Sequence, residues 1–398
     1  MKTRPLVLAG GAALAVALAG FLFAWSGVFN VGASTGHWAI TEWFLHFAMR
    51  NSVETHATGI EAPALDDPAL VLRGAGHYEQ GCVPCHGTPG HPPNPVVRAM
   101  TPPPPHLVDH VGHWAPEELF WIVKHGVKFT AMPAWPARNR DDEVWAVTAF
   151  LLRLPDLSPA EYRHLAHGET ARGHETVADA AIGALSDPLG PILTNCARCH
   201  GYDGSGRGEG AVPILSGQKE VYLYESLKSY AAGERFSGMM QLAASGLSEA
   251  SMAGLARHYA TAGRTGSSAA GRGDDTQETG GALPGDAAAA MAQEGEAIAQ
   301  LGVPAAGIPP CASCHGPAST PRHPLYPVLA GQVPGYLSLQ LNLFKNEARG
   351  GTAYAHIMQT IAKRLSDSQI DAVSQYYGGL ARESLARPAI GNAAPDSP

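Results

Sequence analysis

The five-residue word C-x-x-C-H occurs three times in this chain, as CVPCH at 82–86, CARCH at 196–200 and CASCH at 311–315. At this spacing two thiols can add to the vinyl groups of a haem while the adjacent histidine ligates its iron. A thioredoxin-like redox pair would need a βαβ context and a zinc site would need a matching second pair, and neither is evident. The three words use all six cysteines. The sequence therefore predicts three covalently bound haem c groups, attached at Cys82, Cys85, Cys196, Cys199, Cys311 and Cys314, with His86, His200 and His315 as iron ligands.

The length and composition fit a globular protein of several units. With 398 residues and three haem words, we expect three units of about a hundred residues each. Apolar residues make up 45% of the chain and charged residues 16%, which argues against disorder. The net charge of −8 argues against a nucleic-acid partner.

The N-terminus has the pattern of a membrane anchor. Lys2 and Arg4 precede an uncharged apolar segment of 24 residues, 6–29. The Ala-Leu-Ala at 17–19 could be a signal-peptide cleavage site, but the apolar segment continues past it to spanning length. We expect a retained helix whose basic end stays cytoplasmic, in a bacterial inner membrane, with the haem units facing the periplasm.

The next segment, 31–64, is predicted to be an amphipathic connector. Glu42, His46 and Arg50 recur at four-residue spacing, with aromatic residues elsewhere around the helix. Such a helix could lie at the membrane surface or against a partner subunit, or it could pack on the first haem unit. The sequence leaves these alternatives open.

The first haem unit is predicted to contain two crossing helices. One precedes the haem word and places Gly74 and Tyr78 on one face, and the other covers residues 141–154 with an acidic first turn. Met132, followed by proline, is the candidate sixth iron ligand. Met100 and His106, beside the prolines at 102–105, are competing candidates, whereas the prolines themselves favour a stiff wall.

The second and third units repeat each other. Residues 213–227 match 327–341 at seven positions with their spacing intact, and the segment from Met240 aligns with that from Met358. This alignment selects Met240 and Met358 as sixth iron ligands. Met239 remains the alternative to Met240, because a shift of one residue is easily accommodated in a loop.

The first unit resembles a class I cytochrome c, in which terminal helices cross at a glycine and a Met-Pro loop supplies the sixth ligand, here Met132. Residues 186–381 resemble the two-haem cytochrome c4 family. That resemblance implies that Pro213 and Pro327 present carbonyls to His200 and His315. Arg235 and Arg349 then become candidates for pairing with haem propionates, with a solvated arginine as the alternative. The Gly/Ser/Asp-rich segment between the two halves is longer than a tight pair needs, which argues against close docking.

Together these patterns predict an all-α fold of three tandem class I cytochrome c domains behind an N-terminal transmembrane helix. The expected segments are the anchor 1–30, the connector 31–64, unit 1 at 65–165, unit 2 at 175–262, a flexible linker 263–284, unit 3 at 285–382 and a tail 383–398.

An iron closed by histidine and methionine has no open position for oxygen or peroxide, which leaves electron transfer. We therefore expect an electron carrier, not an enzyme, that relays single electrons in a respiratory chain. Its redox partners would be a quinol-oxidising complex and a terminal cytochrome oxidase. The alternatives are a cytochrome subunit of a membrane-bound dehydrogenase complex and, from a different class, a haem peroxidase with one open iron.

Overall fold

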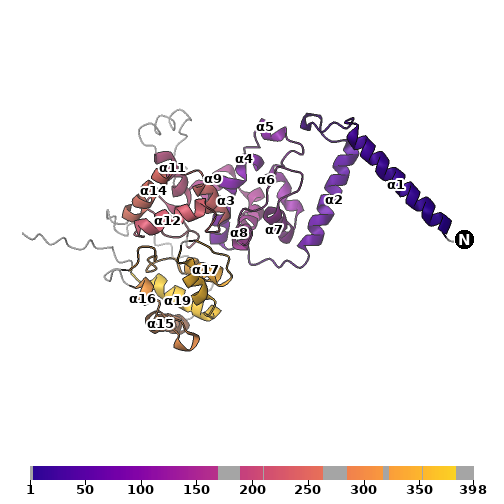
Figure 1. Cartoon of the computed structure of the whole chain (residues 1–398). Coiled ribbons are helices and arrows are strands. Elements are labelled where there is room, and N and C mark those ends of the chain that lie inside the picture. The colour runs from indigo at the N-terminus through magenta and orange to yellow at the C-terminus, as the bar shows by residue number, and fades with distance from the viewer. Residues whose placement is uncertain are drawn as a thin grey trace, which may run out of the picture.

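The computed structural model describes residues 3–168, 189–208, 210–262, 285–316, 322–351 and 353–381. Within these ranges the regular structure is helical, and the β-type pairs are two isolated bridges, Thr88–His91 and Val303–Ile308. The predicted all-α fold is confirmed. Figure 1 shows units 1 and 2 side by side and unit 3, in yellow and orange, against them. The linker at 263–284 and the tail lie outside the described residues.

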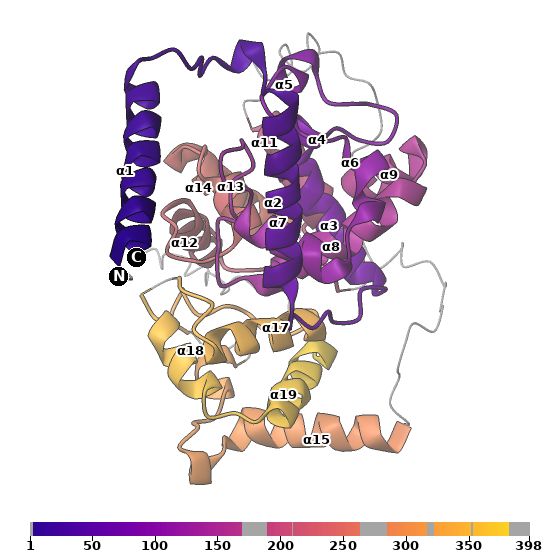
Figure 2. The ribbon, with the colours of Figure 1, turned by 90° about the vertical axis from the view of Figure 1, so that its right-hand side faces the viewer.

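Helix α1 (Thr3–Trp25) extends away from the haem units, whereas α2 (Ala39–Ala57) lies beside unit 1 (Figures 1 and 2). Helix α1 contains one segment, Val7–Trp25, that is long and apolar enough to cross a membrane, as a signal sequence would also be. Helix α2 contacts α7 of unit 1, with Val53 and Ala57 buried. Its first turns instead expose large aromatic residues, namely Trp43, Phe44 and Phe47. The C-terminal half of α2 therefore packs on unit 1, whereas its N-terminal half leaves its aromatic side chains exposed.

Unit 1 is built around the crossing of α3 (Pro68–Gly81) and α8 (Asp141–Arg153). The two helices touch backbone to backbone, because a Cβ on Gly74 would lie only 1.9 Å from the Ala146 carbonyl oxygen. Beside this contact the rings of Tyr78 and Phe150, both fully buried, lie 5.2 Å apart. The predicted crossing at a glycine is confirmed. The other helices of the unit are α4 (Val83–His86), α5 (Pro95–Arg98), α6 (Leu107–His110), α7 (Pro116–His125) and α9 (Pro159–His167).

Units 2 and 3 share a helical order after their haem words. In unit 3, α15 meets α19 as α3 meets α8, since a Cβ on Gly295 would lie 2.1 Å from the Ala372 carbonyl oxygen. In unit 2, α12 packs on α14 through Leu223, Ala256 and Tyr259. The helices are α11 (Gly190–His200), α12 (Glu220–Ala231), α13 (Gly238–Ala244) and α14 (Glu249–Ala262), then α15 (Gly285–Leu301), α16 (Ala312–His315), α17 (Pro334–Lys345), α18 (Ala355–Ala362) and α19 (Asp367–Gly379).

Candidate haem sites

Each C-x-x-C-H word forms one helical turn. The amide of His86 donates to the Cys82 carbonyl at 2.9 Å, and the amide of His315 donates to the Cys311 carbonyl at 2.8 Å. In unit 2 the word closes the longer helix α11. All six cysteines are half-buried and unpaired. This is the short turn that the spacing predicts.

The three histidines have the same anchor. In each, ring atom Nδ1 faces a proline carbonyl, which makes Nδ1 the donor and leaves Nε2 with its lone pair free for a metal. The pairs are His86 with Pro105 at 2.9 Å, His200 with Pro213 at 3.5 Å and His315 with Pro327 at 3.0 Å. The expected roles of Pro213 and Pro327 are confirmed, whereas the sequence analysis missed Pro105 and interpreted its segment only as a wall.

Burial keeps these imidazoles neutral. It lowers the pKa of His200 to about 4 and also lowers the pKa values of His86 and His315. Burial likewise raises the pKa of Cys82 to about 12 and that of Cys196 to about 11. A neutral imidazole with one fixed nitrogen is the form that binds a metal.

The methionines assigned as sixth ligands come from loops or short helices, and all three are half-buried. Met132 follows α7 in a loop where its amide donates to the Thr130 hydroxyl at 3.1 Å. Met240 lies in the first turn of α13, and Met358 lies within α18. Met239 is more buried than Met240, with 8% of its surface exposed. Iron ligation by these sulfurs stays a prediction.

The two competing candidates for the sixth iron ligand of unit 1, Met100 and His106, are less suited to that role than Met132. Met100 is exposed, and His106 is engaged through both ring nitrogens, with the Asp109 carboxylate at 2.9 Å and the Thr88 carbonyl at 3.2 Å. Both features favour Met132.

Arg235 and Arg349 lie where unit 2 meets unit 3. Arg235 is only 5% exposed, so the solvated alternative is wrong for this residue. It donates to the Ser226 hydroxyl at 2.9 Å and to the Tyr336 hydroxyl at 3.4 Å. Arg349 donates to the Tyr222 hydroxyl at 3.4 Å, and its buried Nε has no partner.

Neither arginine forms an ion pair with a carboxylate among the described residues. A buried guanidinium is costly unless an anion compensates its charge. The two arginines therefore fit a group that brings its own carboxylates, as the propionates of haem do. Together with the cysteines and the free histidine nitrogens, the residues present match haem c.

Units 2 and 3 are docked through reciprocal hydrogen bonds, so the expectation of loose docking is wrong. Gln218 donates to the Val328 carbonyl at 2.6 Å and accepts from the Val328 amide at 3.0 Å. Gln332 makes the same pair of bonds to Ile214, both at 2.9 Å. The length of a linker does not predict whether the two units it joins will dock, because a long segment permits both docking and separation. Gln218 and Gln332 align with each other in the repeat, and this match was the sequence signal that could have indicated the interface.

Unit 1 docks on unit 2 through the face of α3 opposite to α8. A Cβ on Gly76 would lie 3.1 Å from the Cys199 sulfur, and Leu72 lies against Gly208 one turn earlier. One turn later, Glu79 lies 3.7 Å from Arg198. The helix that ends at the first haem word thus touches a cysteine of the second.

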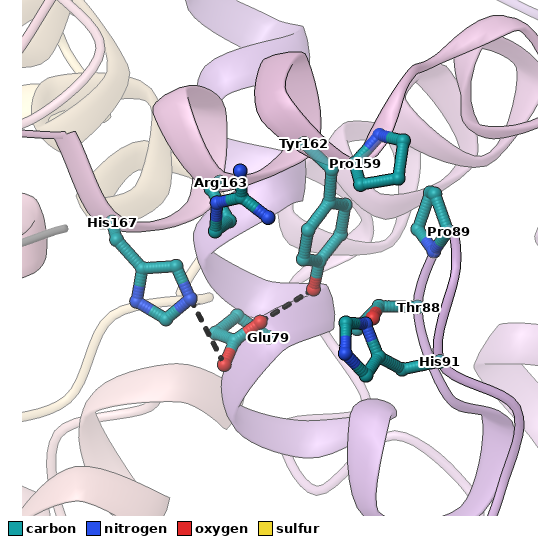
Figure 3. A pocket seen from close by; sticks show the side chains of 8 residues that line it. All are labelled: Glu79, Thr88, Pro89, His91, Pro159, Tyr162, Arg163 and His167. Atoms are coloured by element: carbon teal, nitrogen blue, oxygen red, sulfur yellow. Dashed lines mark hydrogen bonds and ion pairs between the residues drawn. The ribbon is translucent and has the colours of Figure 1, made fainter. Parts of the chain in front are cut away.

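Glu79 also anchors α9 (Figure 3). The hydroxyl of Tyr162 donates to its carboxylate, and Nε2 of His167 lies 3.4 Å away. The three side chains line a small open pocket between α3 and α9. Glu79 therefore connects α3, α9 and unit 2.

Two family models match the chain. Residues 69–151 match a family described as cytochrome c oxidase, cbb3-type, subunit III, and residues 292–380 match cytochrome c. The electron acceptor of thiosulfate dehydrogenase from Thiomonas intermedia is 34% identical over 47% of this chain and 78% of its own length. Cytochrome c4 from Thiocapsa roseopersicina is 32% identical over 53% of this chain and 99% of its own length.

Among solved structures, reduced cytochrome c4 from Pseudomonas stutzeri is 27% identical, covers 49% of this chain and 98% of its own, and has a TM-score of 0.39. Thiosulfate dehydrogenase from Marichromatium purpuratum is 28% identical, covers 51% of this chain and 40% of its own, and has a TM-score of 0.37. The cytochrome c family models, with cytochrome c4 matched almost end to end at 32% identity, show that the chain belongs to the class I c-type cytochromes and is related over about half its length to cytochrome c4.

Proposed function

We propose that this chain is a membrane-anchored, periplasm-facing cytochrome with three haem c groups that relays single electrons in a respiratory chain. The observation that carries the proposal is the serial docking of the units: α3 of unit 1 against Cys199 of unit 2, and the arginine and glutamine contacts of unit 2 against unit 3. A haem iron ligated by histidine and methionine supplies one-electron oxidation and reduction without breaking a bond.

The chain's own residues favour a short path between neighbouring sites. Cys82 directly follows α3, six residues after Gly76, which is about 9 Å along the helix axis. Since Gly76 touches Cys199, the attachment points of the first and second haem groups are close together. At the other junction, the buried Arg235 and Arg349 support a position for the propionates of the second and third groups between units 2 and 3.

Delivery to an oxidase is supported by unit 1, whose matching family is described as a subunit of cbb3-type cytochrome c oxidase. The apolar α1 and the bare aromatic turns of α2 support residence at the membrane, because tryptophan and phenylalanine favour its interface. In that setting the basic N-terminus stays cytoplasmic and the haem units face the periplasm.

A second candidate is that the chain accepts electrons from a dehydrogenase subunit. The relative described as an electron acceptor of thiosulfate dehydrogenase favours it. The two candidates differ in what copurifies from membranes: a copper–haem oxidase supports the first, and a dehydrogenase that reduces the chain with its own substrate supports the second. If neither protein copurifies with the chain, both partner assignments are rejected.

The relay role itself is tested by ligation. We expect Met132→Leu, Met240→Leu and Met358→Leu each to remove one third of the methionine–iron charge-transfer band of the ferric protein. The native ferrous protein should not bind carbon monoxide rapidly. Rapid binding at one native centre would show an open iron there and would favour a peroxidase-type enzyme for that unit.

A further inference from the structure

Glu143 of unit 1 is a buried carboxylate whose hydrogen bonds lead into unit 2. It lies in the first turn of α8 with 4% of its surface exposed. Its Oε1 accepts from the Ser237 hydroxyl at 2.6 Å, and its Oε2 accepts from the Gly238 amide at 2.7 Å. From its own unit, Trp135 donates its indole N–H to Oε2 at 3.0 Å.

Arg140 completes this contact. Its Nη2 lies 3.0 Å from the Glu143 carboxylate, and its Nη1 donates to the Phe236 carbonyl at 2.7 Å. Its remaining donors reach Asp142 at 2.8 and 2.9 Å. Unit 1 therefore holds the backbone around residues 236–238 of unit 2 through both a carbonyl and an amide.

The held segment leads directly to Met240. The Ser237 hydroxyl donates a hydrogen bond to Glu143 and accepts one from the Met240 amide at 3.1 Å, so it caps α13 in one fixed orientation. Gly238 has no room for a side chain, since a Cβ would lie 2.5 Å from the Trp135 indole nitrogen. Glu143, Ser237 and Met240 thus form a continuous chain of two hydrogen bonds.

The described residues of unit 3 do not form such an arrangement. The residue that aligns with Ser237, three before Met358, is Ala355, and α18 has no side-chain cap at its start. In unit 1 the Met132 amide also donates to a hydroxyl, that of Thr130, but among the described residues the carboxylate from another unit is found only at Ser237 of unit 2.

We propose that Glu143 is a positioning residue that sets the place of the Met240 sulfur, so that iron ligation in unit 2 depends on the docking of unit 1. This inference rests on the proposed ligation by Met240. A contact made only for docking could be apolar, whereas a carboxylate matches a serine hydroxyl and a helix amide at once.

The test uses the full-length protein with its haem groups. The variants are Glu143→Gln, Glu143→Ala and Ser237→Ala, and the matched control is Glu249→Gln on the exposed first turn of α14. The readouts are the methionine–iron band and the three reduction potentials from a redox titration. We expect Glu143→Ala and Ser237→Ala to weaken the band by up to one third and to lower one potential, with the other two and the control unchanged. Glu143→Gln should have a smaller effect, because its amide keeps one acceptor.

Met240→Leu separates the two proposals. If it leaves the band intact, the ligation assignment fails, and the path through Ser237 fails with it. If Met240→Leu removes one third of the band while Ser237→Ala and Glu143→Gln keep the full band and all three potentials, ligation stands and the positioning role is overturned. Ser237→Ala changes only a hydroxyl, so it decides the matter even if Glu143→Ala does not fold.

Discussion

Replacement of Gly74 by alanine should destabilise unit 1, although alanine is the better helix former. The added Cβ would lie 1.9 Å from the Ala146 carbonyl oxygen and 2.6 Å from the Cβ of Phe150, so α3 and α8 must separate by about 1.5 Å to restore contact distance. The backbone oxygen cannot rotate away. Because the clash is with a backbone atom, we take the upper part of the usual cost of overpacking, about 2–3 kcal/mol, while alanine gains about 1 kcal/mol of helix propensity over glycine.

The net loss is therefore about 1–2 kcal/mol, which corresponds to a melting temperature lower by about 4–16 °C for a unit of this size. The assay is thermal unfolding followed by tryptophan fluorescence, because all seven tryptophans lie before residue 146 and report on the N-terminal part of the chain. Gly81→Ala in the same helix is the control, since nothing lies within 4 Å of its added Cβ. A Gly74→Ala protein as stable as the wild type would refute the close crossing.

Three further variants test the contacts around the haem sites. Tyr78→Phe removes the hydroxyl that donates to the buried Gly87 carbonyl at 2.8 Å, and we expect a loss of about 1–3 kcal/mol in the same fluorescence assay. Gly76→Leu should push unit 1 away from Cys199 and weaken the magnetic coupling between two haem irons in paramagnetic resonance; unchanged coupling would contradict the proposed path. Gln332→Ala removes both bonds to Ile214, so we expect unit 3 to be released when a protease site engineered into 263–284 is cut, whereas the wild type with the same site stays associated.

Much of the fold could be predicted because local patterns determine it. The haem words specify a helical turn, Gly74 and Tyr78 specify the crossing face, and the repeat locates Pro213 and Pro327. Pro105 was missed because unit 1 lies outside the repeat, and its carbonyl comes 19 residues after its histidine instead of 13 or 12.

Apart from the matched glutamines, the contacts between units could not be predicted, because they depend on which surfaces meet. Glu143 belongs to an acidic first turn, a pattern that a helix dipole explains by itself. That pattern does not indicate that the Glu143 carboxylate is buried against another unit. Likewise, the local sequence around Arg235 does not distinguish an exposed arginine from a buried one.

The reciprocal glutamine contacts have a consequence for any fragment of this chain. Because Gln218 reaches the backbone beside Pro327 while Gln332 reaches the backbone beside Pro213, the two partners present equivalent patches related by an approximate twofold rotation. A patch of that kind is self-complementary. Either half expressed alone would carry the means to form a homodimer through the face that it normally offers to its duplicate.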